Sequence, residues 1–434
     1  MTIEAVWFLI VGALMVLMAL GRKLVERLPM TGAMVYLIVG FLLGPAGVGL
    51  LTIDLERDVR LLRTLTEAGL MVSLFAIGMY LRVELSDPLW RLTLRLAGPA
   101  MLITIAVMFV AARCGLGLAA GPALLLASAL APTDPVLANE LRVEEAGDDE
   151  PLRFALSSEG GLNDGAASPM VYIALALCGV GSLGSGNPWT FALAIAWGLA
   201  SALFFGWALG TAVVVLVTKL RTKYDHALGL EGFLALGIVA LAYGATLIVD
   251  GYAFMAVFAA GVALRRQEME ATGEKPPSEV LESVERGQRE EAAKDPELAH
   301  AYIAENMMGF SVEIERFVEL GLMVIIGSVV SGHWRELIHW SVVWPVLFLF
   351  IVARPLGSTL SLVGSSMDRH QRFLSGWLGL RGVGAFYYLL FSLEEAGHDR
   401  VGPLLPITLA AIVLSVFLHG ASATPLLDRY LKRK

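Results

Sequence analysis

Two short polar stretches carry acids, a hydroxyl group and an amide in the middle of otherwise apolar sequence. The first, SALAPTDPVLANE, contains Thr133 and Asp134 between two prolines. The second, SSEGGLNDGAASPM, contains Glu159, Asn163 and Asp164. Carboxylate, hydroxyl and carbonyl oxygens are the ligands that hard cations prefer in proteins. These residue types therefore indicate a site where a cation and a proton compete for the same oxygen atoms.

The PTDP motif predicts an interrupted helix. Pro132 and Pro135 each remove a main-chain donor, and each disfavours helical backbone at the residue before it. The unwound stretch offers a cation the Thr133 hydroxyl, the Asp134 carboxylate and free carbonyl oxygens. A proline kink in which Asp134 only caps a helix is the alternative.

The spacing within the second stretch predicts a helix with polar groups on adjacent faces. Glu159 and Asn163 are four residues apart, as are Gly160 and Asp164. Removal from water favours the protonated form of a carboxylate, whereas a nearby cation favours the charged form. A buried Asp164 then holds a proton until a metal ion displaces it, which is the chemistry of exchange. Pairing of Asp164 with a buried base is the alternative.

Two arginines also fall within apolar segments. We expect Arg354 to form a structural ion bridge with Glu159, because the pair satisfies both charges at membrane depth. Arg381 lies in GWLGLRGVGAFYY, where Gly379, Gly382 and Gly384 weaken the helix. We expect Arg381 at a second helix break, beside the carbonyl end of a half-helix that attracts positive charge.

The composition places these residues in a membrane. The 434 residues are 56% hydrophobic and only 17% charged, whereas globular domains have about 25% charged residues. Apolar windows of about 20 residues, the length that crosses a bilayer, recur along the chain. The predicted fold class is therefore an all-α polytopic membrane protein surrounded by lipid. The net charge of −8 does not indicate a nucleic-acid partner, and we expect none.

Thirteen apolar segments are expected to cross the membrane. Their approximate limits are 5–21, 32–50, 62–81, 94–113, 118–139, 152–180, 190–218, 228–249, 252–264, 316–332, 340–362, 372–393 and 403–424. Basic residues concentrate in alternate loops, and the bias of such residues towards the cytoplasm predicts the orientation. We expect the N-terminus outside and the C-terminus inside, which requires an odd number of spans.

The spans define a simple organisation of the chain. Residues 1–264 hold the first nine spans, residues 265–315 an acidic cytoplasmic loop, and residues 316–434 the last four spans. The PTDP break lies in the fifth span and the GLRG break in the twelfth, seven spans apart. Because seven is odd, two such repeats run in opposite directions. Paired interrupted helices in inverted repeats indicate a transport site at the membrane midplane.

The motifs together resemble a known family. APTDP in one span followed by EGGLNDG in the next resembles the cation:proton antiporter superfamily, and more closely its NhaP-like sodium/proton antiporters with an Asn-Asp motif. The resemblance extends over the membrane part, including ARPLG around Arg354 and GLRG around Arg381.

This resemblance implies a fold, a partner and a set of roles. It implies two crossing broken helices in a core domain, a dimerisation domain, a homodimer and an elevator-like movement. Asp164 would carry the transported Na⁺, with Asp134 and Thr133 contributing nearby and Asn163 orienting the site. Antiporters with an Asn-Asp pair are implied to exchange one cation for one proton without net charge transfer. No cofactor is expected.

Two positions depart from the family pattern. Gly160 replaces a serine that many relatives carry, and Ala76 stands in the third span where many have a buried acid. Ser157 or Ser158 is expected to compensate for the lost hydroxyl ligand. Because both departures remove ligands, K⁺ or Li⁺ remains open beside Na⁺.

The leading hypothesis is therefore a secondary Na⁺/H⁺ antiporter of a prokaryotic cytoplasmic membrane, with a K⁺/H⁺ antiporter as the alternative. A remote alternative is an intramembrane aspartyl protease, because Asp134 and Asp164 lie on neighbouring spans. Neither acid lies in the usual Tyr-Asp or Gly-x-Gly-Asp signature, because Asp134 stands in PTDP and Asp164 in GLND. A channel or a sensor on the same fold is a third possibility. The sequence contains no phosphate-binding GxxxxGK[ST] loop that would drive a primary pump.

Overall fold

The structure is a computed structural model that describes residues 5, 8–16, 20, 30–134, 150–180, 188–224, 230–273, 275–282, 295 and 298–432. Within these residues the regular structure is entirely helical. The helices are α2 (Gly32–Leu43), α3 (Val59–Tyr80), α4 (Leu89–Arg95), α5 (Met101–Gly115), α6 (Ala120–Leu130), α7 (Pro151–Leu177), α8 (Pro188–Tyr224), α9 (Glu231–Ile248), α10 (Ala253–Thr272), α11 (Pro277–Glu282), α13 (Ala299–Leu337), α14 (Trp340–Phe348), α15 (Arg354–Ser361), α16 (Arg369–Trp377), α17 (Val383–Ala396), α18 (His398–Val401) and α19 (Leu405–Leu431). Three short elements join some of them, namely the π-helical turns η1 (Leu96–Ala100) and η4 (Leu349–Ala353) and the 3₁₀ turn η5 (Gly402–Leu404).

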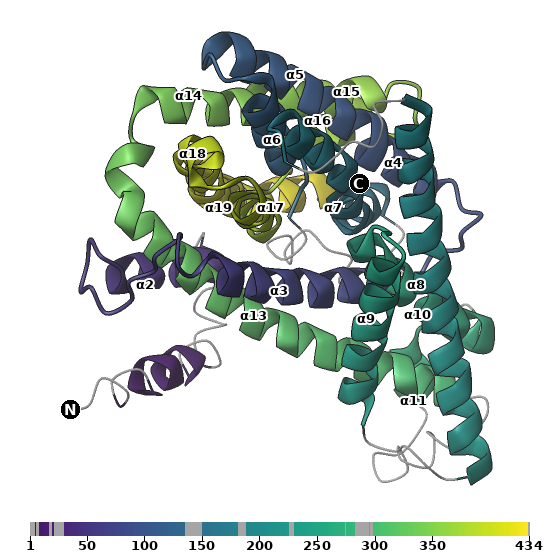
Figure 1. The fold of residues 1–434 in the computed structure, drawn as a ribbon. Helices are drawn as coiled ribbons and strands as arrows, with labels where there is room; N and C mark the ends of the chain where they lie inside the picture. The colour runs from purple at the N-terminus through teal and green to yellow at the C-terminus, as the bar shows by residue number, and fades with distance from the viewer. Residues whose placement is uncertain are drawn as a thin grey trace.

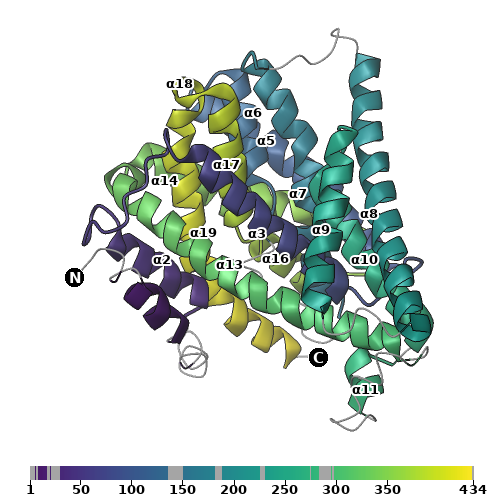
Figure 2. The same ribbon diagram turned by 60° about the horizontal axis from the view of Figure 1, so that its bottom comes forward.

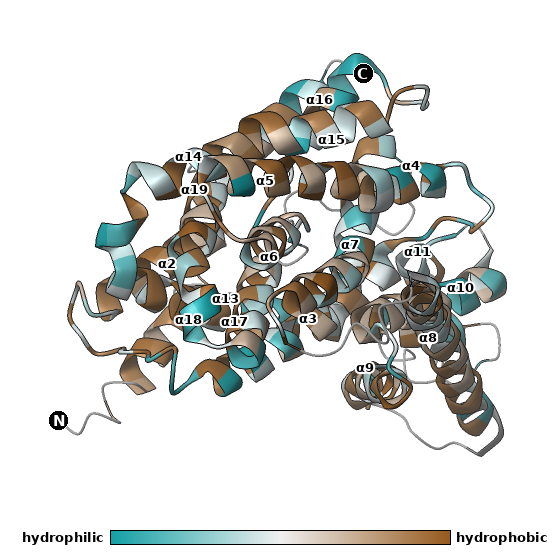
Figure 3. Ribbon diagram, turned by 45° about the horizontal axis from the view of Figure 1, so that its top comes forward, coloured by the Kyte–Doolittle hydropathy of each residue, from teal (hydrophilic) through white to brown (hydrophobic). Residues whose placement is uncertain are grey.

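Six helical stretches of the described chain are long and apolar enough to cross a membrane. They are Val59–Tyr80, Leu89–Gly115, Trp189–Arg221, Glu231–Ile248, Trp340–Ser361 and His398–Leu431. Figure 3 shows apolar residues along most of α5 and α8, whereas α18 is polar. Further expected spans coincide with α7, α10 and α13, whose charged residues lower their hydropathy. The number thirteen stays a prediction.

The helices pack in two groups (Figure 1). In one group α13 packs along α2 and α3, and α10 packs against α3, α8 and α9. The other group contains α4 to α7 and α14 to α19, and its centre is formed by α6, α7 and α17. Contacts of α3 with α17 and of α10 with α7 join the groups. Figure 2 shows α11 and the C-terminus at one end of the bundle and α18 at the other.

The packing of α3 on α10 depends on a close approach of two main chains. Gly78 and Gly261 face each other, and a Cβ atom on Gly78 would lie 2.5 Å from the carbonyl oxygen of Phe258. A side chain at either position would therefore force the helices apart. Small residues at such contacts are typical of helix pairs in membranes.

Both breaks that the sequence predicts coincide with the ends of helices in the second group. Helix α6 ends at Leu130, and residues 131–134 are not helical. Residues 378–382 separate α16 from α17 in the same way. Pro135 lies outside the described residues. The π-helical turns η1 and η4 interrupt two further expected spans, again seven apart, and α15 packs against η1 while α5 packs against η4. Both pairs of interruptions are thus seven expected spans apart, as two repeats of opposite direction require.

Some helix limits differ from the expected ones. Helix α2 ends at Leu43 instead of near residue 50, because Gly44 and Pro45 follow it. Helix α13 begins at Ala299, inside the segment expected to be loop. Its first turns bury Ala301, Ile303 and other apolar residues, a pattern that intervening charged residues hide from a hydropathy average. With 39 residues, α13 is about 58 Å long at 1.5 Å per residue. It is therefore longer than the roughly 30 Å hydrocarbon core, and its start precedes the expected span 316–332.

Candidate cation and proton site

Asp164 lies in the middle of α7 and is completely enclosed. Its side chain is 1% exposed, and neither carboxylate oxygen has a hydrogen-bond partner among the described residues. The helix that carries it starts from a defined cap, since the Glu150 carboxylate accepts from the main-chain nitrogen atoms of Leu152 and Arg153. A carboxylate that receives no donor in a buried position is costly when charged, so its oxygens are available to a proton or a metal ion.

The Asp164 carboxylate lies against the first turn of α17. A Cβ atom built on Gly384 would be 3.0 Å from Asp164 Oδ1 and 3.3 Å from Oδ2. Any larger residue at this position would press on the carboxylate. The N-terminal end of a helix carries a partial positive charge, which stabilises a nearby anion. Because α17 begins at Val383, the positive end of its dipole lies next to the Asp164 carboxylate and stabilises the charged form.

Asn163 connects α7 with the break that follows α6. Its Nδ2 donates to Thr133 Oγ1 over 2.6 Å, and its Oδ1 has no donor within the described residues. Both Asn163 and Asp134 are buried. The Asp134 main-chain nitrogen donates to the Leu380 carbonyl over 2.9 Å, which joins the two breaks directly. The structure thus brings Thr133, Asn163 and Asp164 to one place, with Asp134 at the crossing.

Arg381 binds the open end of α6. Its Nη2 donates to the Ala131 carbonyl over 2.9 Å, and its Nε donates to the Leu130 carbonyl. Nη1 donates within its own segment to the carbonyls of Gly379 at 2.7 Å and Leu380 at 3.0 Å. The last carbonyls of a helix lack partners within the helix, and a guanidinium group satisfies several of them at once.

Glu159 and Arg354 form an ion pair between α7 and α15. Arg354 Nη1 donates to Glu159 Oε1 over 2.5 Å, and Nη2 donates to Oε2 over 2.7 Å. Nη2 also donates to the Ser375 carbonyl in α16 over 3.1 Å. Both side chains are buried. A planar, two-point pair of this kind fixes the relative position of three helices.

Ser158 lies apart from these residues. Its hydroxyl is 2.5 Å from Thr93 Oγ1 in α4 and donates to the Phe154 carbonyl over 2.6 Å. Six residues along a helix separate it from Asp164, which corresponds to about 9 Å along the axis. The structure therefore does not bring the Ser158 hydroxyl to the carboxylate that it was expected to assist.

Tyr388 and Ser168 contact Asp164, although sequence reasoning did not identify them. The Tyr388 hydroxyl donates to the main-chain oxygen of Asp164 and lies 3.2 Å from Ser168 Oγ. Ser168 follows Asp164 by four residues, so helical spacing could have indicated it. No spacing rule relates Tyr388 to Asp164, because 224 residues separate them. Among the described residues no group of three or more His, Cys, Asp or Glu side chains forms a metal cluster.

A comparison with models of protein families identifies the family of this chain. The model of the transmembrane sodium/hydrogen exchanger family matches residues 11–429. The chain belongs to this family. Sodium/hydrogen exchangers are transporters rather than enzymes, and this removes the aspartyl protease alternative. The resemblance to NhaP-like cation:proton antiporters is confirmed.

Individual relatives within the exchanger family agree with this assignment. The K(+)/H(+) antiporter NhaP of Alkalimonas amylolytica is 23% identical over 436 residues, with 98% of this chain and 66% of that protein covered. The chain thus spans about two thirds of the length of that relative. Two structures of the sodium proton antiporter MjNhaP1 from Methanocaldococcus jannaschii have TM-scores of 0.67 and 0.69, at 19% and 18% identity. They cover 99% or more of both chains and confirm the expected fold class.

Proposed function

We propose that the protein is a secondary antiporter that exchanges one monovalent cation, Na⁺ first, for one proton at Asp164. Na⁺ and H⁺ are its substrates, and the prokaryotic cytoplasmic membrane is its location. The observation that carries the proposal is the Asp164 carboxylate, which is buried and receives no hydrogen bond from the described residues. Such a group is most stable when a proton or a cation neutralises it.

The surroundings of Asp164 supply further oxygen ligands. The Thr133 hydroxyl and the Asn163 carbonyl oxygen lie at the helix crossing, together with the Asp134 carboxylate. Hard monovalent cations prefer such neutral and acidic oxygen atoms. A bound cation would have its charge balanced by Asp164, and its departure would leave a carboxylate that must take up a proton. This alternation couples the two substrates and transfers no net charge.

The choice between Na⁺ and K⁺ rests on the ligand set. The name of the Alkalimonas amylolytica relative specifies K⁺, whereas the Methanocaldococcus jannaschii relative is a sodium antiporter. Gly160 and Ala76 supply no oxygen ligand from their side chains. The Ser158 hydroxyl is engaged with Thr93 and Phe154, so it does not replace the missing serine. A K⁺/H⁺ antiporter is therefore the second candidate.

The assembly and orientation are also proposals. We place the N-terminus outside and the C-terminus inside, from the distribution of basic residues. We propose a homodimer in which large apolar side chains of α8, such as Trp189 and Phe204, face lipid or the second subunit. Mass photometry of the detergent-solubilised protein, or cross-linking in membranes, would test the dimer.

Proton flux in proteoliposomes tests the central proposal. Vesicles with an internal pH dye and an acidic interior would receive Na⁺, K⁺ or Li⁺ outside, with wild-type protein or Asp164→Asn. We expect cation-driven alkalinisation that saturates with concentration and disappears in Asp164→Asn. A response to K⁺ alone would retain the mechanism and change the substrate.

The matched control is Asp399→Asn, which removes an exposed acid from α18. This variant should transport like the wild type. Transport by Asp164→Asn at the wild-type rate would contradict the proposed role of Asp164. A flux that neither saturates nor needs a countergradient would indicate a channel.

A further inference from the structure

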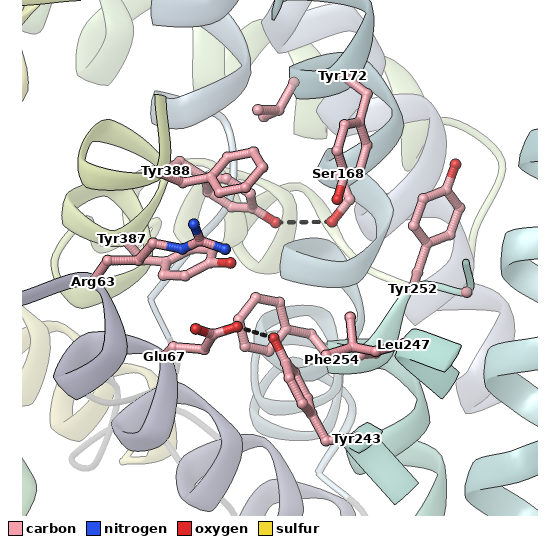
Figure 4. Close-up of a pocket in the computed structure, with 14 residues that line it drawn as sticks. Arg63, Glu67, Ser168, Tyr172, Tyr243, Leu247, Tyr252, Phe254, Tyr387 and Tyr388 are labelled. Carbon is pink, nitrogen blue, oxygen red and sulfur yellow. Dashed lines mark hydrogen bonds between the residues drawn. The ribbon is translucent and has the colours of Figure 1, made fainter. Parts of the chain in front are cut away.

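A pocket of about 100 Å³ lies between the two groups of helices (Figure 4). One wall comes from α3, α9 and α10 and includes Arg63, Glu67 and Tyr243. The opposite wall comes from α7 and α17 and includes Ser168 and Tyr388. We call this cavity the Glu67 pocket. Because its walls belong to different groups, any movement of one group against the other changes its size.

The Glu67 pocket borders the residue that we propose to exchange ions. Ser168 and Tyr388 line it, and their hydroxyl oxygens are 3.2 Å apart (Figure 4). The same two hydroxyls contact the main-chain oxygen of Asp164 from the other side, Ser168 at 3.4 Å and Tyr388 as a hydrogen-bond donor. One layer of hydroxyl groups therefore separates the pocket from the Asp164 segment.

The charges around the pocket favour a cation. Glu67 is the single acid among the fourteen lining residues, and the Tyr243 hydroxyl donates to it. Arg63 is the single lining base, and Glu394 holds it at 2.7 Å. The nearby ionic groups comprise two bases and three acids, namely Arg60, Arg63, Glu67, Glu394 and Glu395. Their net negative charge attracts cations and repels anions.

The size and lining fit a small, partly hydrated ion. A water molecule occupies about 30 Å³ in the liquid, so the cavity has room for a cation with a few water molecules. Five tyrosines and one serine line it, and their hydroxyl oxygens are ligands that hard cations accept. Because Glu394 neutralises the lining Arg63, the Glu67 carboxylate can balance one positive charge, which suits a monovalent ion.

The position in the bundle assigns the pocket to one membrane side. Leu247 and Tyr252 line it where α9 ends and α10 begins, and Arg63 lies near the start of α3. The opposite ends of α3 and α10 carry Arg82 and Arg265. In the orientation proposed above, with the N-terminus outside, this end of the bundle and the Glu67 pocket face the outside.

We propose that the Glu67 pocket is an outer antechamber, in which a monovalent metal cation binds to Glu67 before it passes Ser168 and Tyr388 to reach Asp164. This proposal rests on the exchange proposed for Asp164 and adds a second, weaker cation site to it. Glu67 raises the local cation concentration at the outer entrance and does not take part in the exchange of the proton.

Thiol labelling tests binding without measuring transport. In a Cys114→Ala/Cys178→Ala background, Leu247→Cys places a thiol on the pocket wall, where Leu247 is 51% exposed. A membrane-impermeant, negatively charged methanethiosulfonate would be added to right-side-out vesicles in Na⁺, in K⁺ or in N-methylglucamine at equal ionic strength. We expect a metal cation to change the labelling rate at least twofold, and this change to disappear when Glu67→Gln is added.

Three further variants keep the outcome interpretable. Glu67→Asp retains the charge and should retain the cation effect, whereas loss of the effect in Asp399→Asn would indicate a general surface charge. The Asp164→Asn variant should also keep the effect, because the antechamber is separate from the exchange site. An effect that survives Glu67→Gln, or that is lost in Asp164→Asn, would overturn the antechamber whether or not Asp164 exchanges ions.

A sided transport assay completes the test. In right-side-out vesicles Glu67→Gln should raise the KM for the external cation at least fivefold and leave kcat within twofold. In everted vesicles, where the cation is added to the cytoplasmic side, the KM should stay within twofold of the wild type. An equal rise of KM on both sides would contradict an outer antechamber and indicate a defect of the common site.

Discussion

Arg381 donates from Nη2 to the main-chain oxygen of Ala131 over 2.9 Å, across the crossing of two broken helices. Its Nε donates to the Leu130 carbonyl, and its main-chain nitrogen donates to Ser415 Oγ over 2.7 Å. One side chain thereby holds the end of α6 against the start of α17, and its main chain is tied to α19. The position of Asp134, which hydrogen bonds to Leu380, depends on the same crossing.

Replacement of Arg381 should therefore damage both stability and transport. Arg381→Ala leaves the buried carbonyls of Leu130 and Ala131 without these donors, and each such group costs about 1–3 kcal/mol. Arg381→Lys keeps the charge but loses the planar fork, so it should recover only part of the melting temperature in detergent. A wild-type melting temperature and wild-type Na⁺-driven proton flux in Arg381→Ala would contradict this role.

Disruption of the ion pair between Glu159 and Arg354 should destabilise the protein strongly. Glu159→Gln removes the negative charge that balances the buried Arg354 and replaces one of its two acceptor oxygens by a donor nitrogen. Breaking a buried ion pair typically costs about 3–5 kcal/mol. The double variant Glu159→Gln/Arg354→Met removes both charges and should be more stable than either single variant. The measurement is the melting temperature in detergent of the wild type, the two single variants and the double variant. Additive losses in the double variant would show that the two side chains act independently.

Thr133 should affect cation affinity through Asn163. Thr133→Val keeps the shape of the side chain but removes the acceptor that holds Asn163 Nδ2 at 2.6 Å. We expect the KM for the transported cation to rise about tenfold, which corresponds to about 1.4 kcal/mol. Thr133→Ser retains a hydroxyl and should remain within a few-fold of the wild type. An unchanged KM in Thr133→Val would mean that Asn163 is oriented by other groups.

His300 should make the stability depend on pH. It lies at the start of α13, outside the hydrocarbon core, and burial lowers the pKa of its imidazole below 6.5, while Glu268 opposes this shift. As the pH falls below 6.5, the His300 imidazole becomes protonated in the unfolded chain but not yet in the folded protein. The free energy of unfolding therefore decreases as the pH falls. Above pH 6.5 the imidazole is neutral in both states and has no effect on stability. His300→Gln should flatten the change in melting temperature between pH 7.5 and 5. The exposed His339→Gln is the control, and an identical pH curve for His300→Gln would disprove the effect.

The sequence predicted the parts of the site whose chemistry is local. Prolines flanking Thr133 and Asp134 mark a break, and an acid and a base at membrane depth, Glu159 and Arg354, indicate partners. Roles that depend on contacts between distant parts of the chain were not predicted correctly. Ser158 is engaged by Thr93 of α4, a contact that spacing within one helix does not reveal. The early start of α13 was missed because charges interrupt its apolar face.

Tyr388 and Asp164 provide the last prediction, since the Tyr388 hydroxyl donates to the Asp164 carbonyl between α17 and α7. Tyr388→Phe keeps the ring and removes this bond together with the contact to Ser168. A lost hydrogen bond typically costs about 0.5–1.5 kcal/mol, so the melting temperature should fall by only a few degrees.

The transport effect of Tyr388→Phe should be larger than its effect on stability, because the hydroxyl holds the segment that carries the exchanging acid. We expect the KM for Na⁺ or K⁺ to rise from both membrane sides, unlike the one-sided change expected for Glu67→Gln. Tyr172→Phe removes a hydroxyl from the same pocket without touching Asp164 and should leave the cytoplasmic-side KM unchanged. If Tyr388→Phe altered only the outer KM, Tyr388 would belong to the entrance and not to the positioning of Asp164.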